Sequence, residues 1–213
     1  MQNIFEFLFL QKQKLKKITM KKILLAVLLI APFLGMSQTT KPIDGFSGIK
    51  FGSNSVTVLA ALKAKGGIIN KENTEKDYLA LDHVKIGTRV ASVMVKFIND
   101  KAFEADYLFL PEVEGKLLEL YKGVDNDITL AYGSTKQVSN KYKDPYKEGE
   151  EESLTLIGLS AGNIDFTTSW FDSAENSIQI TITTDMIVKL TYQDNKLTDQ
   201  AVAKQNEKKK SDF

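Results

Sequence analysis

The chain has 213 residues, a formal net charge of +1, no cysteine and one histidine. Residues 1–37 hold six lysines and one acid, so the remainder carries 22 basic and 26 acidic side chains, a net charge of −4. This balance argues against a nucleic-acid partner, because phosphate binding needs a positive surface. Without cysteine there is no thiol catalysis, disulfide or thiolate metal site, and one histidine excludes a multi-histidine site. We therefore expect no metal ion and no cofactor.

The N-terminal region has the pattern of an export signal. Met20-Lys21-Lys22 precedes an apolar run of 13 residues, 23–35, and Gly35 and Ser37 then place small side chains at the −3 and −1 positions. The run is shorter than the roughly 20 residues of a spanning helix. We predict a signal peptide over 20–37, cleavage before Gln38, a periplasmic or extracellular protein, and no integral membrane span after signal removal. The alternative is an uncleaved N-terminal anchor.

Residues 1–19 stand in front of a signal that is already complete from Met20. We therefore expect translation to begin at Met20 and residues 1–19 to be an over-extended start. The Met-Lys-Lys start and the Ser37-Gln38-Thr39-Thr40 boundary resemble those of exported proteins of Bacteroidetes-type bacteria.

A polar lead-in over 38–47 precedes the first predicted unit, 48–110. Apolar residues at three- and four-residue spacing (Val56, Leu59, Leu62) predict a helix, capped by Ser53 or Ser55 and ended by Gly66-Gly67. Three extended segments follow, over 78–84, 90–98 and 103–110. Asn99-Asp100-Lys101 predicts a hairpin turn between the last two, because Asn and Asp tolerate the dihedral angles of such turns.

The second predicted unit, 111–197, repeats this order. An apolar helical stripe runs from Pro111 to Tyr132 and Gly133 ends it. The polar segment 134–153 is predicted to be a loop or mobile arm. Strands are predicted over 154–159, 164–171, 177–184 and 186–192. The polar tail, 198–213, is predicted to be a frayed helix or disordered.

The predicted fold is α+β, with two repeats of one helix followed by about three to four antiparallel strands and the helices packed on the sheet. The order resembles the tandem repeat of β-lactamase-inhibitor-protein-like domains and the single unit of the BamE/SmpA outer-membrane assembly lipoproteins. The local cue is Gly48-Ile49-Lys50-Phe51-Gly52-Ser53 before a helix closed by Gly66-Gly67. The resemblance covers roughly 45–195 and implies a non-enzymatic binding role.

The segment 140–152 is the first candidate for partner binding. It combines Tyr142 and Tyr146 with the acidic residues Glu150, Glu151 and Glu152. Exposed tyrosines suit interfaces because they offer a large amphipathic surface at modest entropic cost. A solvated charge run is the ordinary alternative.

The strand 164–171 supplies the other candidate, Trp170. Phe166 and Trp170 share one face and Phe171 points away. One face is core, and the other is a candidate surface for a sugar or a protein partner. Core packing is the ordinary interpretation of Trp170.

The remaining motifs carry no catalytic pattern. His83 is interpreted as a structural histidine, and Asp125-Asn126-Asp127 lacks the glycine and glutamate of a calcium loop. We expect an exported, non-catalytic binding protein of the cell envelope, with an envelope protein or glycan as partner. The alternatives are an envelope hydrolase that uses paired carboxylates, and a structural or stress protein with no small-molecule site.

Overall fold

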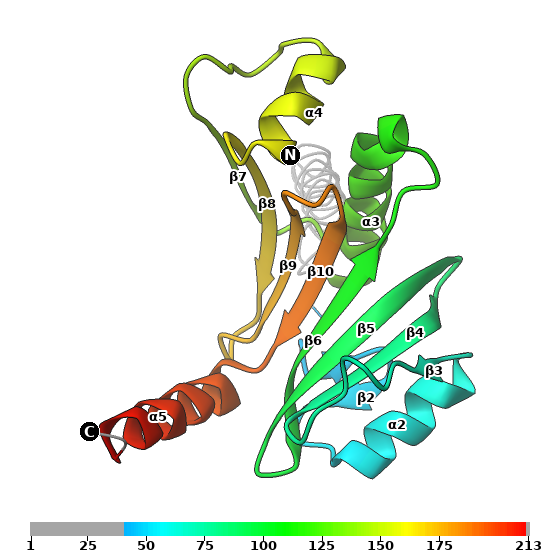
Figure 1. Ribbon diagram of the computed structural model, residues 1–213, viewed down its shortest axis with the longest axis vertical. Helices are drawn as coiled ribbons and strands as arrows, with labels where there is room; N and C mark the ends of the chain where they lie inside the picture. The colour runs from blue at the N-terminus through cyan, green and yellow to red at the C-terminus, as the bar shows by residue number, and fades with distance from the viewer. Residues whose placement is uncertain (1–40, 212–213) are drawn as a thin grey trace, which may run out of the picture. The chain divides into compact units, whose positions relative to one another are not determined.

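The computed structural model describes residues 41–211 (Figure 1). The predicted over-extended start, signal peptide and cleavage site lie outside this range. The described part is α+β, with four α-helices, one eight-stranded antiparallel sheet and a small two-stranded sheet. No helix in it combines the length and the apolar character needed to cross a membrane.

The first half of the described chain contains β1 (Gly45–Phe46), β2 (Ile49–Lys50), α2 (Ser55–Ala64), β3 (Ile68–Ile69), β4 (Tyr78–Ile86), β5 (Arg89–Ile98) and β6 (Lys101–Phe109). The second half contains the short 3-10 helix η1 (Glu114–Lys116), α3 (Leu117–Tyr132), β7 (Gln137–Tyr142), α4 (Glu152–Ser160), β8 (Ile164–Phe171), β9 (Ser177–Ile182), β10 (Val188–Gln193) and α5 (Asn195–Ser211). The predicted strand over 164–171 is confirmed as β8, and the one over 177–184 is confirmed as β9 up to Ile182.

The large sheet has the strand order β3-β4-β5-β6-β10-β9-β8-β7. Strands of the first half therefore occupy one side and strands of the second half the other (Figure 1). The two sets meet where β6 pairs with β10, from Glu104 opposite Gln193 to Phe109 opposite Val188. This pairing makes the sheet continuous.

One face of the sheet packs against helices and carries the core. Cross-strand partners lie on the same face, so the row Leu81–Val93–Tyr107–Leu190–Ile180 crosses five strands of this helix face. All five side chains are buried. Val58 and Leu62 of α2 and Val124 and Ile128 of α3 belong to the same apolar cluster.

Helix α2 begins and ends largely as predicted, with a different cap and stripe. The Asn54 side chain, rather than a serine, accepts a hydrogen bond from the Thr57 N–H at 2.9 Å. The helix ends before Gly66, whose φ of +88° favours glycine. Val58 and Leu62 are the buried residues, and Val56 is exposed. The predicted stripe was therefore wrong at Val56, which lies in the first turn on the solvent side.

The segment 137–160 differs most from prediction. The predicted strand over 154–159 is wrong, because these residues form α4. Acidic Glu152 in the first turn suits the helix dipole, and Thr155, Gly158 and Leu159 are buried. The predicted loop over 134–153 contains the strand β7, which pairs with β8 along six residues. The second half thus has an extra helix between its first two strands.

The tail over 198–213 was predicted to be a frayed helix or disordered, and its described residues form a helix, α5, that begins earlier, at Asn195. Asp194 stabilises its start, since its carboxylate accepts a hydrogen bond from the Leu197 N–H at 2.8 Å. Lys204 Nζ donates to Asn99 Oδ1 at 2.8 Å, so α5 runs beside the β5–β6 turn. In Figure 1 the helix leads away from the end of β10.

Buried tyrosines make the core sensitive to alkaline pH. Tyr107 and Tyr192 pack edge to face with ring centroids 5.8 Å apart. Burial raises the pKa of Tyr107, and burial together with the charges of ionised Tyr132 and Tyr107 raises the pKa of Tyr192 well above its ordinary value. Both are protonated in the folded chain at pH values where an unfolded tyrosine ionises, above about 10.

The stability contributed by the Tyr192 proton is therefore fully present below about pH 10 and is lost as the pH rises further. As the pH rises above about 10, each such tyrosine should lower the free energy of unfolding by about 1.4 kcal/mol per pH unit. We expect Tyr192→Phe to reduce this slope by about the contribution of one tyrosine, as measured by urea denaturation between pH 10 and 12. The wild type and the variant should run parallel from pH 7 to 9. An unchanged alkaline slope in the variant would contradict the assignment.

Candidate functional site

The second face of the large sheet is here called the open face. It carries the side chains of Tyr78, Ser92, Met94, Lys96, Glu104, Asp106, Thr191, Gln193, Gln179, Ser177 and Phe171, which are partners in successive strand pairs. Most of them are polar, in contrast to the largely apolar helix face. Polar side chains on a solvated sheet face leave donors and acceptors free for a ligand.

One row of the open face ends in an aromatic side chain on each side. It runs Tyr78–Lys96–Glu104–Gln193–Ser177–Phe171 across six adjacent strands. Tyr78 is 39% exposed and Phe171 is 50% exposed. Five strand spacings place the two rings roughly 24 Å apart along the sheet. We call this row the aromatic-ended row.

A buried carboxylate lies at the centre of the open face. Asp106 is 3% exposed and accepts a hydrogen bond from Thr191 Oγ1 at 2.6 Å. Lys189 Nζ lies 3.4 Å and Lys96 Nζ 4.0 Å from its carboxylate oxygens. Lys96 also pairs with Glu104. Burial lowers the pKa of Lys96, but the hydrogen bond and charge of Glu104 outweigh it and raise that pKa.

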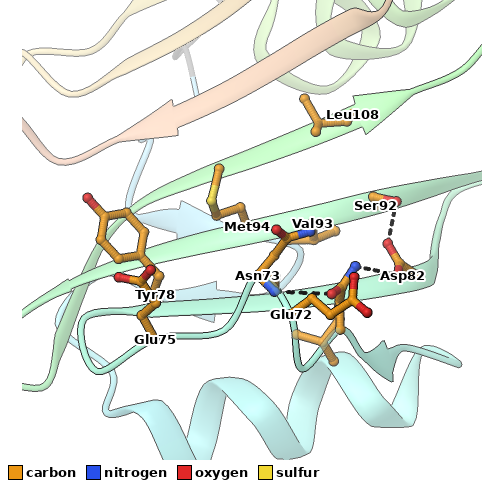
Figure 2. A pocket seen from close by; sticks show the side chains of 12 residues that line it. Glu72, Asn73, Glu75, Tyr78, Asp82, Ser92, Val93, Met94 and Leu108 are labelled. Atoms are coloured by element: carbon orange, nitrogen blue, oxygen red, sulfur yellow. Dashed lines mark hydrogen bonds between the residues drawn. The ribbon is translucent and has the colours of Figure 1, made fainter.

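A cavity of about 550 Å³ opens beside β4, and we call it the β4 cavity (Figure 2). Asp82 lies at one end, where Ser92 Oγ donates to it at 2.7 Å and Asn70 Nδ2 at 3.0 Å. A β-bulge after Leu81 shifts the register here. Tyr78 and Glu75 lie at the other end, with Met94 between (Figure 2).

A second cavity of about 770 Å³ adjoins the first at Tyr78, which lines both. It lies between α5 and the hairpin of β5 and β6, and we call it the α5 cavity. Phe97, Phe103 and Val202 supply apolar surface. The pair of cavities therefore flanks one end of the aromatic-ended row.

A third cavity of about 350 Å³ lies on the second half of the sheet, and we call it the β7 cavity. Lys141 and Asp165 are cross-strand partners at its edge. Thr167, Thr181 and Gln179 line the rest. One lysine and one carboxylate leave this cavity without net charge.

The structure gathers the predicted 140–152 residues at one end of β7, near the start of α4. Tyr142 is partly buried, with its ring 6.1 Å from that of Phe166. Burial and the charges of Glu148 and Glu150 raise the pKa of Tyr142. Tyr146 is partly buried and packs against Gly158. Glu151 and Glu152 are exposed, while Glu150 is partly buried.

Trp170 lies apart from this group and inside the core. It is 2% exposed, and its Nε1 donates to the Gly133 carbonyl at 3.1 Å. Ile164, the partner of Tyr142, is six residues away along β8, roughly 20 Å. Trp170 therefore offers no surface to a partner, whereas its neighbour Phe171 does.

The structure also gives the positions of the other residues that the sequence analysis considered, His83 and the Asp125-Asn126-Asp127 motif. His83 is exposed in the β-bulge of β4, with a φ of +61°. Asp127 of α3 pairs with Arg89 of β5, and Asp125 pairs with Lys136. Across residues 41–211, no three His, Asp or Glu side chains are grouped so that they could hold a metal ion.

Three residues that line the β4 cavity, Tyr78, Asp82 and Ser92, were not singled out from the sequence. They line one cavity because β3, β4 and β5 pair and residues of the 70–77 loop complete its lining. The alternation over 78–84 was the available signal, and the β-bulge interrupts it. Comparison with protein-family models, with characterised proteins and with solved structures finds no match.

Proposed function

We propose that the chain is an exported, non-catalytic binding protein of the cell envelope, and that its open face holds an envelope protein or glycan. The observation that carries this proposal is the aromatic-ended row, with Tyr78 and Phe171 exposed at its two ends. Exposed aromatic side chains offer large contact areas at low entropic cost.

The surroundings of the row support recognition of an extended partner. Gln193 and Ser177 lie between the aromatic ends and can exchange hydrogen bonds. Cavities adjoin the row on the first half of the sheet, and the β7 cavity opens on the second half. A partner that spans the row would contact residues from six strands, a longer contact surface than a single loop provides.

The proposed fold assignment is a tandem repeat, with units at 48–110 and 111–197, similar to β-lactamase-inhibitor-protein-like domains. Strand order supports it, since each half places its strands in sequence order from one sheet edge toward the centre. In each half, a helix that packs on the helix face, α2 or α3, also precedes the strands of the large sheet. The extra helix α4 is then an insertion in the second unit.

The proposed address is the periplasm or the outside of the cell. It rests on the signal peptide at 20–37, with translation from Met20 and cleavage before Gln38. The wider region around Tyr142, Tyr146 and Glu150 is a secondary contact surface in this proposal.

Site-specific photo-crosslinking tests the binding role. A photoreactive residue is placed at Tyr78, at Phe171 or, as a control, at Leu130 of α3, which is 78% exposed. In intact host cells, we expect the same adduct from both ends of the aromatic-ended row and none from Leu130, with the adduct identified by mass spectrometry. An adduct from Leu130 alone, or no adduct from either row position, would overturn the proposal.

A further inference from the structure

The two cavities that adjoin at Tyr78 differ from the β7 cavity in charge. Glu72, Glu75 and Asp82 line the β4 cavity, and its lining contains no lysine or arginine. The α5 cavity adds Asp77, Glu104 and Glu207, against Lys96 and Lys204. Lys96 is already paired with Glu104. The first half of the open face therefore carries an excess of negative charge.

The lysines nearest in sequence do not cancel this charge inside the cavity. Lys71 and Lys76 are exposed in the same loop, and neither lines the β4 cavity. Asp82 has two carboxylate oxygens, and each accepts one hydrogen bond, from Ser92 or Asn70. A carboxylate can accept about four, so acceptor capacity remains at the end of the cavity.

Apolar and aromatic surface lies beside the carboxylates. The exposed ring of Tyr78 stands between the two cavities, and Met94 lies on the floor of the first. Aromatic faces attract guanidinium and ammonium groups. Phe97 and Phe103 line the second cavity, where aliphatic side chains would be the complement.

We infer that the β4 and α5 cavities together dock a basic segment of a partner protein. Its lysine or arginine side chains enter the β4 cavity toward Asp82, Glu72 and Glu75, and its apolar side chains lie against Tyr78 and the α5 cavity. Charge complementarity selects this occupant over an acidic one. The inference rests on the proposed binding function and names the chemistry of the partner.

Direct binding of defined peptides tests this inference. The probes are fluorescent twelve-residue peptides with four repeats of Lys-Ser-Leu, of Glu-Ser-Leu or of Gln-Ser-Leu, and fluorescence anisotropy is the measurement. We expect binding of the lysine peptide only, weakening as salt rises because the charges are partly solvated. Equal or tighter binding of the glutamate or glutamine peptide would overturn the inference, as would no binding of the lysine peptide.

Two matched triple variants locate the site. Glu72→Gln/Glu75→Gln/Asp82→Asn should weaken the affinity for the lysine peptide by about tenfold or more. Glu112→Gln/Glu175→Gln/Asp185→Asn removes the same charge from exposed residues that line neither cavity and should change binding less than about twofold. Equal losses in the two variants would overturn the assignment to the β4 cavity. Glu72→Gln/Glu75→Gln, with both changes in the exposed loop, replaces the first variant if that variant does not fold.

The two proposals fail separately. If the lysine peptide does not bind but adducts still form at Tyr78 and Phe171, the basic partner is wrong and the binding function stands. If the adducts are also absent, the binding function fails too.

Discussion

Replacing Trp170 by alanine is expected to lower the free energy of unfolding by about 3–5 kcal/mol, the usual loss for a large buried aromatic side chain. Trp170 is 2% exposed, and its ring lies under Lys136 Nζ, 5.6 Å from the ring centroid. The substitution opens a cavity between β8 and the end of α3, and it leaves the Gly133 carbonyl without its indole donor. Natural domains are stable by only about 5–15 kcal/mol.

The adjacent residue is the matched control. Phe171 lies on the opposite face and is 50% exposed, so Phe171→Ala should cost less than about 1 kcal/mol. Urea denaturation followed by circular dichroism measures both variants. Trp170→Phe should fall between them, because it keeps most of the buried ring and loses the hydrogen bond. Equal losses for Trp170→Ala and Phe171→Ala would contradict the placement of Trp170 in the core.

Replacing Asp106 by alanine is expected to cost about 3 kcal/mol, a value at the lower end for a broken buried ion pair. The substitution leaves the Thr191 hydroxyl without its acceptor and removes the carboxylate between Lys96 and Lys189. Both lysine side chains are about one-third exposed, and water therefore offsets part of the loss.

Two further variants separate the hydrogen bond from the charge. Asp106→Asn keeps an acceptor for Thr191 and should lose about half as much stability. Asp165→Ala removes an exposed carboxylate on the same face and should change stability by less than about 0.5 kcal/mol. Urea denaturation at pH 7 compares the three. A loss below about 1 kcal/mol for Asp106→Ala would contradict the claim that Asp106 stabilises the fold through its contacts with the two lysines.

Local signals in the sequence were sufficient for the β5–β6 hairpin. Asn99 and Asp100 take φ values of +50° and +59°, which their short polar side chains tolerate. The alternating residues Phe103, Ala105, Tyr107 and Phe109 of β6 are all buried, but Ala102 and Asp106 are buried as well, which the alternation does not predict. The two glycines Gly66-Gly67 were a local signal of the same kind, and they predicted the end of α2.

The errors arose where tertiary packing decides the structure. The apolar run from Leu154 to Leu159 fits a short buried strand or a short helix equally well. Contacts of Gly158 with Ile164 and Tyr146 accompany the helix. β7 is mostly polar, with Val138 exposed, and only its pairing with β8 makes it a strand.

The candidate site depended on pairings that no local signal specifies. Asp82, Ser92 and Tyr78 line one cavity through the register of β4 and β5. The aromatic-ended row needs β6 to meet β10, whose residues are separated by about 85 positions in the chain. The sequence showed an exposed aromatic opposite Trp170, but not that a second one shares its row.

The position of β10 has a consequence for the order of assembly. The last strand of the described residues, β10, lies in the middle of the sheet, between β6 and β9. Until β10 docks, β6 and β9 each present an unpaired edge, the kind of edge that recruits strands from other molecules. A chain cut before Val188 would keep both edges permanently. Protection of these two edges against aggregation is therefore completed only by β10, after every other strand of the sheet has been synthesised.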